Sequence, residues 1–139
     1  MVVLDTNIII DNLRTAGRSP LLTKISDSLN SYDIFVSVLT VQELFAGDSA
    51  GDLETSIKIK KILAEFTCVD YDYEKAELAG ELVRKARKCG HALHVADAAI
   101  AATAISLNAQ LATKNIKDFY RISGLALLDI ENLQPLRLI

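Results

Sequence analysis

Short apolar runs alternate with longer amphipathic stretches along the chain. The first run, Val2–Leu4, is followed at once by the polar residues Asp5, Thr6 and Asn7, and then by a second apolar stretch toward Leu13. This pattern predicts a buried strand that ends at Asp5 and a helix that begins near Thr6 or Asn7. In open parallel α/β sheets, ligands bind beyond the carboxyl ends of the strands. We therefore expect Asp5 to lie where such folds carry out chemistry.

The same alternation continues along the rest of the chain. Four further short apolar runs predict strands at residues 34–38, 67–69, 110–113 and 126–129. The intervening stretches have helical spacing and predict helices at residues 20–29, 40–46, 53–66, 73–88, 95–107 and 116–121. Strands that alternate with helices indicate βα units around a parallel sheet. We predict one α/β domain over residues 1–139, a three-layer α/β/α sandwich around a mostly parallel five-stranded sheet.

Composition narrows the class of protein. Half of the 139 residues are hydrophobic and the mean hydropathy is +0.25, which is enough for one domain with its own core. Cys68 and Cys89 are isolated and form no C-x-x-C pattern, which favours a reduced, cytoplasmic protein. No basic-then-apolar leader precedes the first strand, and the longest apolar tract, residues 95–107, is too short to span a bilayer. We expect neither a signal peptide nor a membrane role.

The charge balance bears on nucleic-acid binding. The formal net charge is −3 and the pI is about 5.3. A protein that binds nucleic acid through a general basic field has the opposite balance. An RNA or DNA partner would therefore require local basic patches or bound cations.

Four polar positions lie beside apolar runs, where a polar side chain needs a partner. They are Asp5, Glu43, Asp97 and Asn115, and Asp118 follows closely after the last. Each has a purely structural explanation: Asp5 and Asn115 can cap helices, and Glu43 completes a capping box with the threonine three residues before it. Asp97 lies in the first turn of its helix, where the helix dipole favours an anion.

Helix capping does not explain why these residues converge. Asp5, Glu43 and Asn115 follow the first, second and fourth predicted strands, so they point to one edge of the sheet. Asp97 begins a helix that is otherwise almost entirely apolar. Carboxylates that converge repel one another unless a cation holds them, and oxygen-only ligands suit Mg²⁺ or Mn²⁺. A hard cation on carboxylates, open to water, is suited to phosphodiester hydrolysis.

Four segments resemble the motifs of PIN-domain nucleases. They are Asp5-Thr6-Asn7, Gln42-Glu43-Leu44, residues 96–104 and residues 111–119. Their order and the size of the chain resemble a VapC-type toxin ribonuclease. The resemblance implies a PIN fold and an endoribonuclease that uses Mg²⁺ or Mn²⁺ on an acid cluster to activate water. It also implies a homodimer that a small cognate antitoxin neutralises.

The resemblance also assigns roles to the acids. Asp5 and Asp97 would be direct metal ligands, and Glu43 would complete the acidic triad directly or through water. The fourth position is often acidic in the family but is Asn115 here, which removes one charge and would weaken a second metal site. Asn115 is expected in the site, and Asp118 is the other candidate for this position.

Other polar residues are candidates for supporting roles. Thr6 and Thr113 are placed to hydrogen-bond the carboxylates or a phosphate, and Asn7 to orient Asp5, although all three also suit turns and caps. Four cations flank the predicted site in sequence and are candidates for RNA phosphate contacts. These cations are Arg14, Arg18, Lys114 and Lys117.

Two other functions stay open at this point. A receiver or phosphatase-like domain with Asp5 as the phosphate acceptor would need a partner acid, commonly as D-x-D, but Asn7 holds that position. A PIN-like protein-binding module without catalysis would retain an acid cluster whose repulsion lowers stability. Toxin and housekeeping RNA processor share the same chemistry, and the sequence does not separate them.

Overall fold

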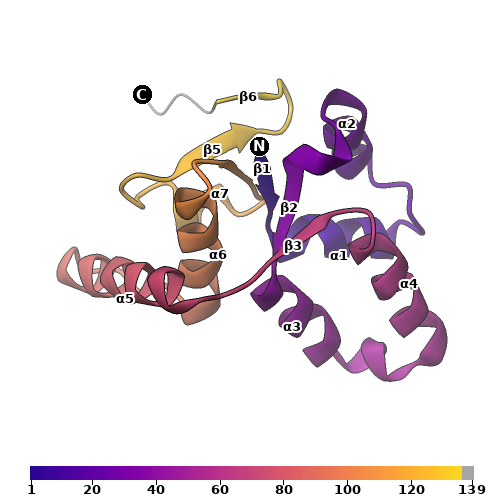
Figure 1. The fold of residues 1–139 in the computed structure, drawn as a ribbon, viewed down its shortest axis with the longest axis horizontal. Helices are drawn as coiled ribbons and strands as arrows, with labels where there is room; N and C mark the ends of the chain where they lie inside the picture. Colours follow the sequence, from indigo (N-terminus) through magenta and orange to yellow (C-terminus); the bar gives the residue numbers. More distant parts are fainter. Residues whose placement is uncertain (136–139) are drawn as a thin grey trace.

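The computed structural model describes residues 1–135 and consists of one sheet covered by helices on both faces (Figure 1). The strands are β1 (Val2–Leu4), β2 (Ile34–Ser37), β3 (Thr67–Val69), β4 (Gln110–Ala112), β5 (Ala126–Asp129) and β6 (Gln134–Pro135). The helices are α1 (Thr6–Arg14), α2 (Pro20–Ser28), α3 (Val38–Ala46), α4 (Leu53–Leu63), α5 (Tyr73–Lys88), α6 (Val95–Ser106) and α7 (Ile116–Phe119). Short 3₁₀ turns lie at Ser31–Asp33 and Asp48–Gly51.

The first strand of the chain lies at the centre of the sheet. The strand order is β3-β2-β1-β4-β5-β6, and the first five strands of this order pair in parallel. Leu4 pairs with Val36 of β2 on one side and with Ala112 of β4 on the other. The carboxyl ends of β1, β2 and β4 therefore meet at one edge, as the sequence predicts.

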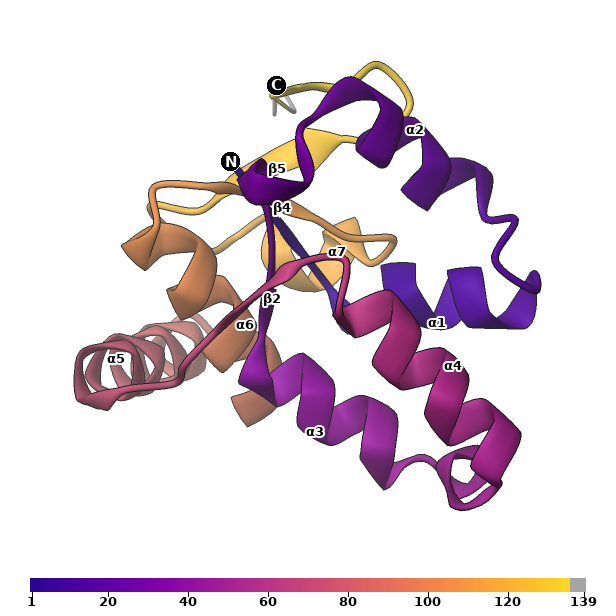
Figure 2. The same cartoon turned by 45° about the vertical axis from the view of Figure 1, so that its right-hand side comes forward.

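Alternate residues of β1 point into two separate cores. Val2 and Leu4 pack in the core covered by α1, α2, α3 and α4, whereas Val3 packs in the core covered by α5, α6 and α7. Figures 1 and 2 show these two groups of helices on opposite sides of the strands. All three β1 residues are at most 2% exposed, as expected for a parallel strand covered on both faces. The predicted three-layer sandwich is confirmed.

Helix α6 lies deep in the second core. Every residue from 98 to 104 is fully buried, and five of these seven are alanines. Small side chains let the helix approach the sheet and α5 closely. Among residues 1–135, no helix is both long and apolar enough to span a membrane.

The structure differs from the sequence prediction at several ends of elements. β2 ends at Ser37, which caps α3 by accepting a 3.1 Å hydrogen bond from the backbone N–H of Leu39. Helix α3 thus begins at Val38, two residues earlier than predicted. Helix α4 ends at Leu63, three residues earlier than predicted. A sixth strand, β6, pairs antiparallel with β5, so the sheet has six strands where five are predicted.

Candidate acidic site at the carboxyl edge of the sheet

Asp5 lies between the end of β1 and the start of α1, and it is only 4% exposed. Its Oδ1 accepts a 2.8 Å hydrogen bond from the backbone N–H of Thr6. Its Oδ2 accepts bonds from the amide of Asn7, at 2.8 Å, and from the hydroxyl of Thr113, at 2.6 Å. A carboxylate has about four acceptor positions, so these bonds leave one, on Oδ1, for a ligand. Asp5 therefore caps α1 and still has an oxygen available for chemistry.

Burial and hydrogen bonding act in opposite directions on Asp5. Burial raises the pKa of its carboxyl group, and the negative charge of Glu43 raises it further. The hydrogen bonds from Thr113, Thr6 and Asn7 lower that pKa, but the net result is a pKa above the usual value. The three donors thus partly offset the desolvation of a charge that the fold keeps buried.

Glu43 is joined to the end of β1 through Thr6. The hydroxyl of Thr6 donates a hydrogen bond to the Glu43 carboxylate, and its oxygen lies 3.1 Å from that of Thr40. Because Ser37 caps α3, the capping-box explanation for Glu43 does not hold. The carboxylate is instead oriented by a residue adjacent to Asp5.

Asp97 lies in the first turn of α6, and its pKa is raised to about 6. Burial is the main cause, followed by the negative charge of Asp5, while His94 acts in the opposite direction. Asp118 and Glu43 raise this pKa further. The structure therefore brings these acids, which come from four helices or helix starts, within electrostatic reach of one another.

Asn115 and Asp118 lie together at the exposed rim of this site. The Asn115 side-chain amide donates a hydrogen bond to the Asp118 carboxylate, and its backbone N–H donates to the Thr113 hydroxyl at 3.0 Å. Asn115 precedes α7, but its side chain makes no capping hydrogen bond. The two candidates for the fourth position are therefore in contact, and the charge of Asp118 reaches Asp97.

The donor set fits a hard cation in its chemistry. The three ion pairs of residues 1–135, Lys58–Glu54, Lys75–Asp72 and Lys114–Asp11, leave Asp5, Glu43 and Asp97 without a cationic partner. Carboxylate oxygens that repel one another are suitable ligands for Mg²⁺ or Mn²⁺. In the same described part of the chain, no three His, Cys, Asp or Glu side chains are already grouped as a metal site. Coordination would thus require the carboxylates to move closer together.

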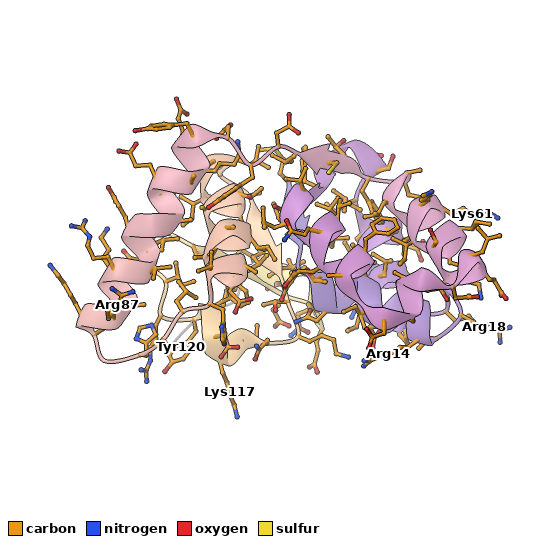
Figure 3. The ribbon with its side chains drawn as sticks, turned by 90° about the horizontal axis from the view of Figure 1, so that it is seen from below. Arg14, Arg18, Lys61, Arg87, Lys117 and Tyr120 are labelled. Atoms are coloured by element: carbon orange, nitrogen blue, oxygen red, sulfur yellow. The ribbon has the colours of Figure 1, made fainter. Side chains whose placement is uncertain are left out.

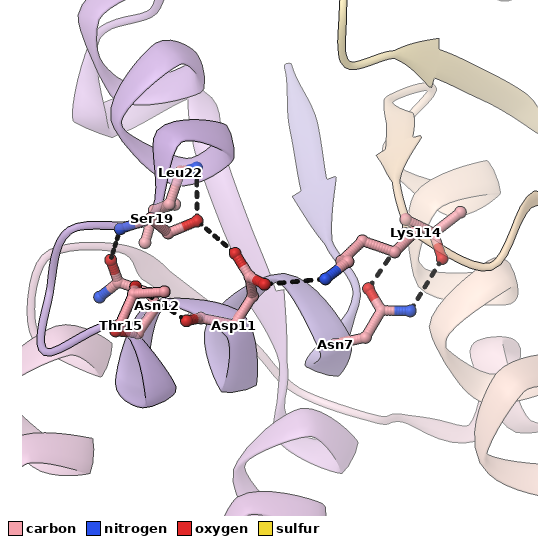
Figure 4. A network of polar contacts seen from close by, with 8 residues as sticks. Asn7, Asp11, Asn12, Thr15, Ser19, Leu22 and Lys114 are labelled. Carbon is pink, nitrogen blue, oxygen red and sulfur yellow. Dashed lines mark hydrogen bonds and ion pairs between the residues drawn. The ribbon is translucent and has the colours of Figure 1, made fainter.

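A second polar network adjoins the acids and includes a residue that the sequence analysis missed. Lys114 Nζ lies 2.8 Å from Asp11 Oδ1, and the Ser19 hydroxyl donates a 2.6 Å hydrogen bond to Asp11 Oδ2 (Figure 4). These bonds lower the pKa of Asp11, with Lys114 as the largest cause. Asp11 lies one helical turn after Asn7, and this i,i+4 spacing is the signal that could have identified it.

The predicted phosphate-binding cations differ in their surroundings. Lys114 is in an ion pair with Asp11. Arg14 and Lys117 point outward on the same side of the molecule, and Arg18 lies beyond Arg14 (Figure 3). A groove of about 370 Å³ between α1, α3 and α4 is lined by both Glu43 and Arg14.

Comparison with known proteins gives consistent matches over most of the chain. The PIN domain family model matches residues 2–125. "Ribonuclease VapC1" of Haemophilus influenzae is 34% identical over 125 residues, which cover 88% of this chain and 92% of the relative.

Solved structures are similar as well. VapBC2 of Rickettsia felis, bound to a DNA fragment from its promoter, has a TM-score of 0.77 and 28% identity, covering 90% of this chain and 96% of that one. VapBC-1 of nontypeable Haemophilus influenzae has a TM-score of 0.79 and 27% identity, covering 94% and 99%.

Proposed function

Because the chain belongs to the PIN-domain family and, within it, to the VapC ribonucleases, we propose that it is a metal-dependent endoribonuclease and the toxin of a toxin–antitoxin pair. The observation that carries this proposal is the buried carboxylate of Asp5 at the end of the central strand, with Asp97 and Glu43 in electrostatic reach. Carboxylates gathered in this way fit a cation-dependent hydrolase better than a site with a protein nucleophile.

The residues of the site would have two kinds of role, metal binding and the orientation of the metal ligands. Asp5 and Asp97 would hold Mg²⁺ or Mn²⁺, and Glu43 would complete the set directly or through water. When bound, the cation would lower the pKa of a water molecule and offset negative charge at the scissile phosphate. Thr113 and Asn7 fix the orientation of Asp5, and Thr6 fixes that of Glu43. With a pKa of about 6, Asp97 is mostly ionised at neutral pH and available as a ligand.

Asn115 would serve the site as a neutral member. Its amide donates to Asp118, which keeps that carboxylate at the rim beside Asp97. A second cation would therefore meet one charge fewer than in relatives with an acid at position 115. We propose Asn115 as the fourth site residue, with Asp118 acting through it.

RNA would approach the acids between basic side chains. Arg14 and Arg18 lie on the α1 side and Lys117 lies on α7 (Figure 3). RNA phosphates on both sides of the scissile bond would therefore lie near a basic side chain. These contacts are local, as the net charge of −3 requires. An RNA substrate also agrees with the cytoplasmic location expected from the sequence.

The partners proposed are a small cognate antitoxin and a second copy of the chain. The structural relatives named above are VapBC assemblies, and one of them is bound to promoter DNA. By analogy with these assemblies, we propose that this chain binds an antitoxin of its own. Sedimentation of the purified protein alone, and together with the product of the adjacent gene, would measure both assemblies.

The direct test is cleavage of a mixed RNA pool by purified protein, with Mg²⁺ or Mn²⁺ and with EDTA. Asp5→Asn and Asp97→Asn are the test variants, and Asp48→Asn, an exposed acid in the 3₁₀ turn after α3, is the matched control. We expect cuts that require the cation, vanish in both test variants and persist in the control. Cutting that survives EDTA and both substitutions would contradict the proposal. Mass spectrometry of the preparation checks that no copurified antitoxin masks the activity.

A further inference from the structure

We propose that Lys114 and Asp11 form a positioning pair for Asp5, and that Lys114 acts through this pair and not by contacting RNA. This inference rests on the proposed function and adds two residues to its machinery. The sequence offers Lys114 as a phosphate contact, but the structure gives its ammonium group a different partner.

Residue 114 is attached to α1 at two points one helical turn apart. Its side chain pairs with Asp11 at 2.8 Å, and its backbone N–H donates a 3.2 Å hydrogen bond to Asn7 Oδ1 (Figure 4). The turn between β4 and α7 is thereby held against the first two turns of α1. This turn also contains Thr113, which donates to Asp5.

The backbone contact determines which way the Asn7 amide faces. Because Oδ1 of Asn7 accepts from the Lys114 N–H, its Nδ2 faces Asp5 Oδ2 at 2.8 Å and Thr113 Oγ1 at 3.2 Å. A flipped amide would present its oxygen to the Asp5 carboxylate, where two acceptors repel. If residue 114 moves away from α1, Asn7 loses the contact that keeps its donor toward Asp5.

Asp11 is itself fixed, so it can serve as the anchor of the pair. Its second oxygen accepts a 2.6 Å hydrogen bond from Ser19, which is fully buried at the N-cap of α2. The anchoring therefore runs from the buried start of α2, through Asp11 and Lys114, to the turn that holds Asp5. Each step of this path is a contact between named atoms.

The pair is suited to positioning more than to stabilising the fold. The Lys114 and Asp11 side chains are 45% and 23% exposed, and partly exposed ion pairs contribute little to the free energy of unfolding. Residues that orient metal-site ligands typically change activity or metal affinity by about 10- to 100-fold when substituted. The effect of breaking this pair should thus appear in kcat and not in the melting temperature.

The test compares Lys114→Met, Asp11→Ala and the double variant with wild type, on an RNA oligonucleotide that wild type cleaves. We expect kcat to fall about 10- to 100-fold in each single variant, with KM changed less than about threefold. The double variant should be no worse than Asp11→Ala, because Asp11→Ala already removes the partner of the Lys114 ammonium group. Lys114→Arg keeps the pair and should retain most of the activity.

The matched control is Lys58→Met, which breaks a 2.7 Å ion pair with Glu54 on the exposed face of α4. It should leave kcat, KM and the melting temperature unchanged. A direct phosphate contact by Lys114 predicts a different result, in which KM rises, kcat holds, and Asp11→Ala leaves RNA binding intact. That result would overturn the positioning role.

A second readout keeps the two proposals separate. If wild type cleaves no RNA with either cation, the proposed function fails, and Mn²⁺ affinity measured by calorimetry still tests the pair. Lys114→Met and Asp11→Ala should weaken Mn²⁺ binding by about 10-fold or more, whereas Lys58→Met should not. Equal Mn²⁺ affinity in all three variants, or no Mn²⁺ binding by wild type, would refute the positioning pair.

Discussion

The hydroxyl of Thr113 donates a 2.6 Å hydrogen bond to Oδ2 of Asp5, although 108 positions separate the two residues in the chain. The bond joins the ends of the neighbouring parallel strands β1 and β4. Thr113 is 1% exposed and Asp5 4%, so the interaction is shielded from water. The bond lowers the pKa of a carboxyl group that burial raises, and it thereby favours the charged form.

Replacing Thr113 with valine should impair both cleavage and stability. Valine conserves shape but removes the donor to Asp5, and it leaves the backbone N–H of Asn115 without its acceptor. The amide nitrogen of Asn7 loses its 3.2 Å contact with Thr113 and keeps only its bond to Asp5. We expect cleavage to fall by about tenfold or more. The free energy of unfolding should fall by about 2 kcal/mol, as measured by urea denaturation. Thr103→Val is the matched control, because Thr103 is equally buried in α6 but donates only to the backbone of Ala99.

Asp97→Asn should stabilise the protein at neutral pH in the absence of divalent cations, even though it removes cleavage. The folded protein holds the Asp97 proton up to about pH 6, whereas the usual carboxyl pKa is 3.8. Since the folded state binds this proton more tightly than the unfolded state, the contribution of Asp97 to stability is greatest below about pH 4 and falls as the pH rises through 6. Asparagine removes that loss. In EDTA, the melting temperature of the variant minus that of wild type should increase from pH 4 to pH 7. A difference in melting temperature that stays constant with pH would contradict the raised pKa of Asp97.

Mn²⁺ should raise the melting temperature of wild type, and more so at pH 7.5 than at pH 5. A ligand at 100 times its Kd stabilises the folded state by about 2.7 kcal/mol, which corresponds to roughly 5–10 °C for a domain of this size. At pH 5 the proton on Asp97 competes with the cation. Asp5→Asn and Asp97→Asn should lose the Mn²⁺-dependent shift, while Asp48→Asn should keep it. A shift that persists in both site variants would place the cation elsewhere.

Asn115→Asp should make the protein less stable without a cation and more responsive to one. The Asn115 amide now donates to Asp118, and an aspartate would bring two carboxylates together in its place. We expect a lower melting temperature in EDTA and a larger rise with Mn²⁺ than in wild type. Asn30→Asp, an exposed amide before the first 3₁₀ turn, is the control for charge alone. A variant that matches wild type under both conditions would remove Asn115 from the site.

Much of the fold could be predicted because each β/α unit has a local signature. β1 and the first three residues of β2 are continuous apolar runs, and Pro20 begins α2 at the position where proline is favoured. The PIN fold and the ribonuclease class are confirmed by the family match and the relatives. β6 has only two residues, one of them a proline, which is too short for an alternation of apolar and polar residues to predict a strand. The single-domain prediction over residues 1–139 extends past residue 135, where the described part of the chain ends.

The acids that follow strands were predictable from the sequence, and so was a hydrogen bond from Thr113 to a carboxylate, although Thr113 lies 108 positions from Asp5. The roles of Asp5, Glu43, Asp97 and Asn115 stay predictions, but the structure does bring the three acids into electrostatic reach. Asp11 escaped notice because it lies within a helix and not at the end of a strand, and its partner, Lys114, is 103 positions away. The capping-box hypothesis for Glu43 was wrong because Ser37, one turn earlier, takes the N-cap. Such choices between competing local caps depend on where the strand ends, which tertiary packing decides.

The central place of β1 has a consequence for the timing of synthesis. β1 leaves the ribosome well before β4, one of its two sheet neighbours, which starts at residue 110. At about 5–20 residues per second, several seconds pass before the second neighbour is made. Until then Asp5 has no Thr113 to hold it. The acidic site is thus completed only after residue 113 has been made, so RNA cleavage that depends on this site cannot begin while the preceding segments are being synthesised.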